Sequence, residues 1–530
     1  MSQSQPLETL GLAELMAVDL VGLSDGEGMK LAAHLIDLGS DNGDEAALAR
    51  AEGVLDGLAK RGTLKPRAAS RSHYFRANLW SSRRKQRGSA KSWAWRSTEA
   101  DNEILELRRA IAHPGFAELH ILERAQLLTN LGNALNHIGR FVESIEAWDR
   151  ALVCEPRLAM ANGNRGLGLG HYAAALYDPG HNAVLALAAR DALSRAIAPE
   201  ALLDSSGLEP ALAMFVGAKG SLDAHFNDAD VSGAADLDSY SLGRGKREQA
   251  YRRWCLDNRL FLNPLNDLGP HAIAGRDVMT LPSISVTGLD GGPGPPPVIH
   301  YFNGLKQEFA TARYTLYEGL TDRGVHPSDR GVLLYNTLDY PAFGLGVERV
   351  KMAFRSAYAL LDKIGFLLNA YLDLGHGERQ VSFRNLWFKG GKGKELHPSL
   401  DGLANWPLRG LYWLSKDVFE DAFRQVTEPD AQALYELRNH LEHKFVGVRD
   451  DILLGLAPSA FTQPVPGVFA IPFDQLAART LRQLKLARAA LIYLALGLHA
   501  EERRRNAGRS DGLVMPMALD TWDDRWKRRD

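Results

Sequence analysis

Six consecutive residues near the carboxyl end combine the side-chain types that could bind and cleave a phosphodiester. They read Arg438-Asn439-His440-Leu441-Glu442-His443. A guanidinium matches two phosphate oxygens with one planar fork, and an imidazole can take or give a proton near neutral pH. Asn439 and His443 are four positions apart and share one helix face, whereas Arg438 lies about 140° away around the axis. The pattern predicts a metal-free ribonuclease site with Arg438, Asn439 and His443 as its catalytic set.

The spacing alone is not specific, because arginine followed by histidine recurs elsewhere in the chain. Similar pairs are Arg67/His73, Arg108/His113 and Arg165/His171. What distinguishes the Arg438 copy is its predicted helix over 431–445, whose apolar stripe is Leu434, Leu437, Leu441 and Phe445. A charged, solvated helix face without chemistry stays open as the alternative. His440 and His443 could share a metal, but no third ligand is evident, so the sequence predicts neither a metal nor a cofactor.

Composition limits the class of protein. The chain has 530 residues and a formal net charge of −2, so several domains are expected and any binding of nucleic acid must depend on local patches. Two cysteines, Cys154 and Cys255, are typical of a reducing compartment. The amino-terminal residues carry no signal-peptide pattern, and the longest apolar run, 489–498, is too short to span a bilayer. A cytoplasmic protein without membrane contact is expected.

A helical repeat covers residues 125–156, which read AQLLTNLGNALNHIGRFVESIEAWDRALVCEP. This segment resembles a tetratricopeptide repeat, with small residues where two antiparallel helices approach each other and a glycine at the turn. The residues that carry the resemblance are Leu131, Gly132, Leu135, Gly139, Phe141, Ser144, Trp148, Ala151 and Pro156. One repeat cannot bury its own apolar face. We therefore expect a solenoid over residues 25–200, with a degenerate second copy from 159 to about 197 and a protein or peptide segment as its ligand.

A basic stretch interrupts the predicted solenoid. Between Arg67 and Arg96 lie nine Lys or Arg side chains and no acid, interleaved with tryptophans. We expect a long loop here that binds RNA, since cations attract phosphates and indole rings stack on unpaired bases. The residues assigned to this contact are Arg83, Arg84, Lys85, Arg87, Lys91, Trp93 and Trp95. The alternative is a solvated loop whose tryptophans belong to the solenoid core.

The rest of the chain divides by composition into connectors and a carboxy-terminal helical region. Residues 1–24 form an amino-terminal segment, and 201–300 form a connector with a docking segment at 248–270 and a Pro/Gly linker at 288–298 that cannot be helix. Residues 509–530 are a charged tail. A helical bundle is expected over residues 301–508, with helices at 308–320, 347–374, 408–419, 430–445 and 475–504.

The bundle with its Arg438–His443 motif resembles the HEPN superfamily, whose signature is arginine, four to six residues, then histidine. The subfamily with amino-terminal tetratricopeptide repeats is most similar, and residues 251–267 resemble its marker segment. The resemblance implies an all-α fold, a tetratricopeptide-type solenoid followed by a HEPN-type antiparallel bundle. It also implies a metal-independent endoribonuclease of a toxin or antiphage defence type, acting on RNA as a homodimer whose two motif helices share one cleft. Arg438, Asn439 and His443 match the motif, and His440 and Glu442 are auxiliary.

Two other functions compete with this one. A non-catalytic tetratricopeptide scaffold, with an inactive HEPN bundle used only for dimerisation, is favoured by the repeat itself. Nucleotidyl transfer would need paired carboxylates at a suitable spacing, and no such motif is evident. Cleavage of RNA in the presence of EDTA separates the enzyme from the scaffold.

Overall fold

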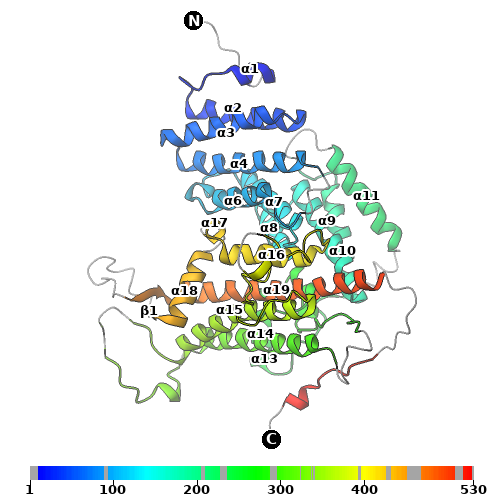
Figure 1. Cartoon of the computed structure of the whole chain (residues 1–530), viewed down its shortest axis with the longest axis vertical. Coiled ribbons are helices and arrows are strands. Elements are labelled where there is room, and N and C mark those ends of the chain that lie inside the picture. The colour runs from blue at the N-terminus through cyan, green and yellow to red at the C-terminus, as the bar shows by residue number, and fades with distance from the viewer. Residues whose placement is uncertain are drawn as a thin grey trace.

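The computed structural model describes residues 7, 10–88, 94–203, 209–226, 236–286, 295–322, 324–335, 337, 341–391, 395–424, 431–449, 467–507 and 517–527. Helices dominate these ranges and stack from the amino-terminal end to a carboxy-terminal bundle (Figure 1). The predicted fold class, a helical solenoid followed by a helical bundle, is confirmed. A small sheet, which the sequence did not predict, is added to the bundle.

The solenoid consists of helices that pack mainly on their neighbours in the sequence, as expected of a repeat architecture. Polar side chains cap the N-termini of several of these helices. Ser24, Asp44 and Asp178 accept hydrogen bonds from first-turn N–H groups. The helices are α1 (Leu12–Ala17), α2 (Asp25–Asn42), α3 (Glu45–Arg61), α4 (Pro66–Gln86), α6 (Thr98–Ala112), α7 (Ile121–His137), α8 (Phe141–Cys154), α9 (Ala159–Ala175), α10 (Pro179–Ala196) and α11 (Glu209–His225).

Close packing of α7 on α8 explains why the repeat has a glycine at position 132. A Cβ atom on Gly132 would lie 2.5 Å from Nε1 of Trp148, a fully buried indole. Trp148 Nε1 donates to Asn133 Oδ1 at 3.0 Å, so its polar group is satisfied inside the pair. A Cβ atom on Gly168 of α9 would also meet this indole. One tryptophan therefore joins the repeat to the following helix.

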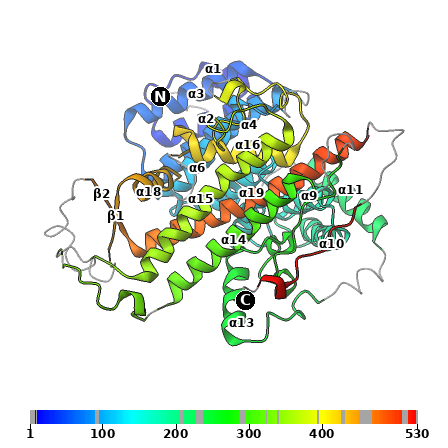
Figure 2. The same cartoon turned by 60° about the horizontal axis from the view of Figure 1, so that its bottom comes forward.

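The bundle is built from long helices that cross one another (Figure 2). Its helices are α14 (Pro297–Thr321), α15 (Leu345–Leu372), α16 (Trp406–Phe419), α17 (Asp421–Arg424), α18 (Ala431–His443) and α19 (Phe473–Ala507). The central helices α15 and α19 pack on each other, and each also packs on α14. The prediction that residues 288–298 cannot be helix is wrong at its end, because α14 begins at Pro297. Proline is tolerated at the first helical position, where its missing N–H would have no partner.

Two short strands lie between the motif helix α18 and helix α19 in the chain, and both strands pack against both helices. Strand β1 (Phe445–Arg449) pairs in parallel with β2 (Val468–Pro472), and Pro341 forms an antiparallel bridge with Arg449. The predicted helix over 431–445 is therefore too long by two residues, since α18 ends at His443. Alternating Val446 and Val448 suit a strand, because β-branched side chains pack well on a pleated surface.

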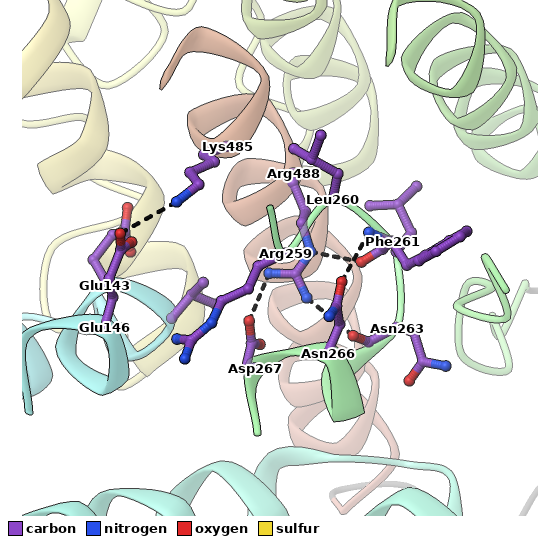
Figure 3. Close-up of polar contacts among 12 residues, drawn as sticks. Glu143, Glu146, Arg259, Leu260, Phe261, Asn263, Asn266, Asp267, Lys485 and Arg488 are labelled. Atoms are coloured by element: carbon purple, nitrogen blue, oxygen red, sulfur yellow. Dashed lines mark hydrogen bonds and ion pairs between the residues drawn. The ribbon is translucent and has the colours of Figure 1, made fainter. Parts of the chain in front are cut away.

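The segment after α13 (Lys246–Asp257) lies between solenoid and bundle, and it includes the short helices η3 (Pro264–Asp267) and η4 (Ala272–Ala274). Arg488 of α19 is almost fully buried and donates to the carbonyls of Phe261 and Asn263 at 2.6 and 2.9 Å. Its guanidinium also lies 2.6 Å from the Asp267 carboxylate (Figure 3). On the other side, Arg259 pairs with Asp149 of α8. These contacts attach the segment to both regions.

Buried charges join α16 of the bundle directly to the solenoid. Asp417 accepts two hydrogen bonds from Arg108 at 2.6 and 2.9 Å and one from Arg140 at 2.7 Å. Arg140 also binds Glu143, whose carboxylate accepts from Tyr493 of α19. One apolar core extends from the solenoid through the bundle, while α1–α4 contribute to a separate one. The proposed domain boundaries stay predictions.

Candidate functional site

Helix α18 presents the motif at the surface of the bundle. Its stripe of Leu434, Leu437 and Leu441 is buried, and the helix packs on α15, α16 and α17. Burial of this stripe fixes the rotation of α18 about its axis. The polar residues Arg438 and His443 are consequently held at or near the surface instead of inside the core.

Arg438 rests on an aromatic ring of the neighbouring helix. Its guanidinium carbon lies 5.4 Å from the ring centre of Tyr358 on α15, a distance typical of a cation–π contact. Nη1 of Arg438 also lies 3.4 Å from Oδ1 of Asn439, so the two adjacent motif residues are in contact. The side chain is half-buried. The structure therefore holds a cation in a defined position that solvent still reaches.

The two histidines of the motif have different surroundings. His440 Nδ1 lies 2.8 Å from the carbonyl oxygen of Glu436, and its ring is 5.0 Å from the ring of Phe469 in β2. His443 is exposed. His440, predicted as auxiliary, is thus held against the sheet, and His443 is the imidazole that a ligand from solvent can reach.

An arginine that the sequence analysis missed completes the end of α18. Arg355 of α15 donates to the carbonyl of Leu441 in the last turn, where intrahelical partners are lacking. It also lies 3.8 Å from Glu442, the second predicted auxiliary residue. Arg355 and Tyr358 are three positions apart on α15 and so face the same neighbour. That spacing, next to the apolar stripe of α15, is the signal that could have indicated them.

The structure brings only part of the predicted catalytic set together. Arg438 touches Asn439 and lies on Tyr358 of α15, whereas His443 is exposed in the last turn. Within the described part of the chain, no hydrogen bond or ion pair joins Arg438 to His443. A single copy therefore presents the guanidinium and the exposed imidazole of the predicted set without contact between them.

The predicted basic loop is largely helix. Residues 66–86 form α4, and acidic side chains of neighbouring helices neutralise its arginines. Arg83 pairs with Glu45 and Glu52, Arg84 with Glu103, and Arg87 with Glu99.

One of the two tryptophans assigned to RNA contact in this stretch is a core residue. Trp95 is 3% exposed and donates to the carbonyl of Leu403 at 2.9 Å. Lys85 is exposed, and Lys91 and Trp93 lie outside the described residues. Trp95 packs against Trp387 and Tyr412 of the bundle. The arginines of the stretch pair with glutamates of other helices, and a count of charges along the sequence cannot detect such pairs.

A cavity of about 20 Å³ between α8 and α19 is lined by charged side chains, including Glu146, Arg259 and Lys485 (Figure 3). Its volume suits about one water molecule. Among the residues that the structure describes, no three His, Cys, Asp or Glu side chains are grouped so that they could hold a metal ion. No described helix is long and apolar enough to cross a membrane.

Comparison with known proteins supports the interpretation of the bundle. Residues 289–501 match the model of the family described as LA2681-like HEPN. This range contains α14 to α18 and most of α19, with Arg438, Asn439 and His443 on α18. No curated protein and no solved structure matches the chain. The predicted HEPN resemblance is confirmed for the bundle, and the more specific subfamily with tetratricopeptide repeats stays a prediction.

Proposed function

We propose that this protein is a metal-independent endoribonuclease of a toxin or antiphage defence type, which cleaves RNA in a cleft shared by two copies. The observation that carries the proposal is the position of the motif. Exposed His443 and the half-buried, ring-supported Arg438 lie on one helix of a HEPN-type bundle. The solenoid, which is joined to α16 by buried ion pairs, regulates or targets the bundle.

The proposed reaction is an in-line attack of a ribose 2′-oxygen on the adjacent phosphorus. A bond forms between that oxygen and phosphorus, and the bond from phosphorus to the 5′-oxygen breaks, which leaves a 2′,3′-cyclic phosphate and a 5′-hydroxyl. His443 of one copy takes the proton of the 2′-hydroxyl, and the imidazolium of the second copy protonates the leaving 5′-oxygen. Arg438 stabilises the negative charge that develops on the non-bridging oxygens.

Neighbouring residues position these groups. Asn439 orients the phosphate or the guanidinium by hydrogen bonding, in keeping with its 3.4 Å contact to Arg438. Tyr358 supports the guanidinium, and Arg355 holds the last turn of α18, two residues before His443. Glu442 keeps Arg355 in place through their ion pair, and His440 links the helix to β2. His440 and Glu442 are thus positioning residues in this proposal.

The proposal is tested by incubating purified protein with total RNA and EDTA. The wild type should cleave RNA, and His443→Ala should lower the rate by about 10²–10⁴-fold, the usual contribution of a general acid–base group. His300→Ala is the matched control, since His300 is an exposed histidine of α14 away from the motif. Equal melting temperatures of the three proteins would show that the variants fold. Undiminished cleavage by His443→Ala would contradict the catalytic assignment.

One observation favours a second candidate, a non-catalytic scaffold. Arg438 is engaged with Tyr358 and Asn439, and nothing described within one chain joins it to His443. A bundle retained only for dimerisation could keep such a stacked arginine for stability. RNA that stays intact with wild-type protein under every condition tried would support the scaffold.

A further inference from the structure

Three consecutive exposed residues form the junction between the motif helix α18 and strand β1. His443 ends α18, Lys444 follows it, and Phe445 begins β1. The junction therefore presents an imidazole, an ammonium group and a phenyl ring in succession. His443 belongs to the predicted catalytic set, whereas Lys444 and Phe445 have no role in that set.

Packing among the described residues does not explain why Phe445 is aromatic. Its side chain is 76% exposed, while Val448, on the opposite side of β1, is buried in the bundle core. Because side chains alternate along a strand, Phe445 points away from that core. A phenyl ring that stays in water contributes little to the free energy of folding, since the hydrophobic gain depends on the apolar area that is buried.

A second phenyl ring lies on the same side of the sheet. Pro341 forms an antiparallel bridge with Arg449, which alternation places on the side of Phe445. Phe343, two residues after Pro341, is on that side as well and is 61% exposed. Two rings are therefore exposed on one surface of the sheet, next to the end of the motif helix.

Positive charge accompanies the two rings. Glu442 is the acid nearest to the junction on α18, and it is paired with Arg355 at 3.8 Å. Lys444 is exposed and forms no ion pair with a described residue. Together with the half-buried Arg438, the end of α18 thus has three cations against one carboxylate.

A nucleic-acid strand has the groups that suit both the cations and the rings. Its phosphates bind cations, and the faces of its bases stack on aromatic side chains. An apolar protein surface would cover the rings but would also bury Lys444 without a counter-charge, which costs free energy. The exposed rings and the adjacent positive charge favour a nucleic acid over a protein as the ligand of this junction.

We propose that Phe445 stacks on the nucleobase beside the bond that is cleaved, and that Lys444 binds the adjoining phosphate. This assignment rests on the proposed function, which places the reacting phosphate at His443. Phe445 is two positions after His443, a span of about 7 Å at most, so a strand held at the imidazole reaches the ring within one or two nucleotides. Phe343 offers a second ring to the base that follows.

Stacking on Phe445 also selects among substrates. Only a base that is unpaired and unstacked can lay its face on a side chain. The two fused rings of a purine cover a phenyl ring more fully than the single ring of a pyrimidine, and stacking strength is a source of sequence preference in strand binding. Phe445 therefore sets a preference for an unpaired purine next to the cleaved bond.

Binding is tested separately from cleavage in the His443→Ala background, so that the probe stays intact. Fluorescence anisotropy measures the affinity of the full-length protein for a labelled, unstructured RNA of about twelve nucleotides. Phe445→Leu keeps an apolar side chain but loses the ring, and it should weaken binding about tenfold, whereas Phe445→Tyr should stay within about threefold. Tyr301→Leu, at a 45% exposed ring in the first turns of α14, is the matched control and should change the affinity by less than about twofold.

The salt dependence of the same measurement tests Lys444. Lys444→Gln removes one phosphate contact, so the slope of log affinity against log salt concentration should fall by about 0.7. Phe445→Leu should leave this slope unchanged, because stacking releases no counterions. An unchanged slope for Lys444→Gln would overturn the phosphate contact.

Two results would overturn the stacking site, provided that melting temperatures show the variants to be folded. One is an affinity of Phe445→Leu equal to that of its parent. The other is a changed oligomeric state of Phe445→Leu in sedimentation velocity, which would assign the rings to a contact between protein chains.

Cleavage by protein with an intact His443 separates failure of the stacking site from failure of the proposed function. If both hold, wild type should cleave an RNA with a purine beside the cut faster than its pyrimidine counterpart by about threefold or more, and Phe445→Leu should lose this preference. RNA that binds through Phe445 but is never cut would refute the nuclease and leave the stacking site standing. Cleavage with the same KM and the same base preference in Phe445→Leu would leave the nuclease standing and refute the stacking site.

Discussion

Arginines at the solenoid–bundle interface and the arginine of the motif have opposite surroundings. Arg140 is fully buried and binds two carboxylates, and Arg488 is 2% exposed and binds Asp267 and two carbonyls. Arg438 is half-buried on a tyrosine ring, and among the described residues it forms no ion pair. Charge in this protein therefore occurs in two settings. Paired, buried charge joins the regions, and the partly exposed cation on α18 is the one to which the proposed function assigns a ligand.

The largest effect is expected from removing the carboxylate at the centre of the interface. Asp417→Ala leaves Arg108 and Arg140 buried without their shared partner, which should lower the free energy of unfolding by about 3–5 kcal/mol. Urea denaturation measures this change. Asp257→Ala, at an exposed position at the end of α13, should change it by less than about 0.5 kcal/mol. Similar losses in the two variants would show that the interface charges do not stabilise the fold.

A smaller loss in the free energy of unfolding is expected where two backbone segments touch across the same interface. Gly139 has a φ of 90°, and a Cβ atom there would lie 2.2 Å from the carbonyl oxygen of Trp406 and 2.8 Å from the nitrogen of Gly410. Gly139→Ala should therefore cost about 2 kcal/mol or more through strain and overpacking. Gly170→Ala is the control, because no atom lies within 4 Å of its added Cβ and the helix gains propensity. Equal unfolding free energies for the two variants would be inconsistent with close contact at Gly139.

At the motif, the support beneath Arg438 should matter for catalysis. Tyr358→Leu removes the ring face and should slow RNA cleavage about tenfold, which corresponds to about 1.4 kcal/mol of transition-state stabilisation. Tyr358→Phe keeps a ring and should stay within about threefold of wild type. Single-turnover cleavage rates test both variants. A Phe variant as slow as the Leu variant would assign the effect to the hydroxyl and not to the cation–π contact.

The smallest effect is expected from Glu146, and it changes how steeply stability falls in acid. Burial alone would raise the pKa of Glu146, but Lys485, Arg482 and Arg259 outweigh burial and hold this pKa at about 2. Since the folded pKa lies below the ordinary value of 4.5, its stabilising effect is present above pH 4.5 and is lost as the pH falls toward 2. Melting temperatures from pH 6 to 2.5 should fall less steeply for Glu146→Gln than for wild type. If the melting temperatures of the two proteins fall in parallel with pH, the Glu146 carboxyl does not contribute to stability.

Periodicity predicted most helices of the bundle but not the way its regions join. The stripe of apolar residues located α15 to within two residues, because one face of a helix must be buried. The basic stretch was predicted as a loop with free cations, but Arg83 and Arg84 are neutralised by glutamates from other helices. Such pairs depend on tertiary structure. The parallel strands β1 and β2 are 18 residues apart in the chain, so no hairpin signal indicates their pairing.

The sequence predicts the motif residues but not their surroundings. Arg438, Asn439 and His443 are named from their types and spacing, and their catalytic roles stay a prediction. The spacing of Arg355 and Tyr358 indicates only that they share one face of α15, and their roles depend on where α15 passes α18. His440 resembled His443 in the sequence, and only packing against Phe469 separates the two.

The chemical ends of RNA cleaved in EDTA distinguish acid–base cleavage at α18 from cleavage that needs a metal ion. Wild-type protein should produce fragments that end in a 2′,3′-cyclic phosphate and begin with a 5′-hydroxyl, and His443→Ala should produce almost none of them. Fragments with a 3′-hydroxyl and a 5′-phosphate, formed only when a divalent cation is restored, would contradict acid–base cleavage at α18.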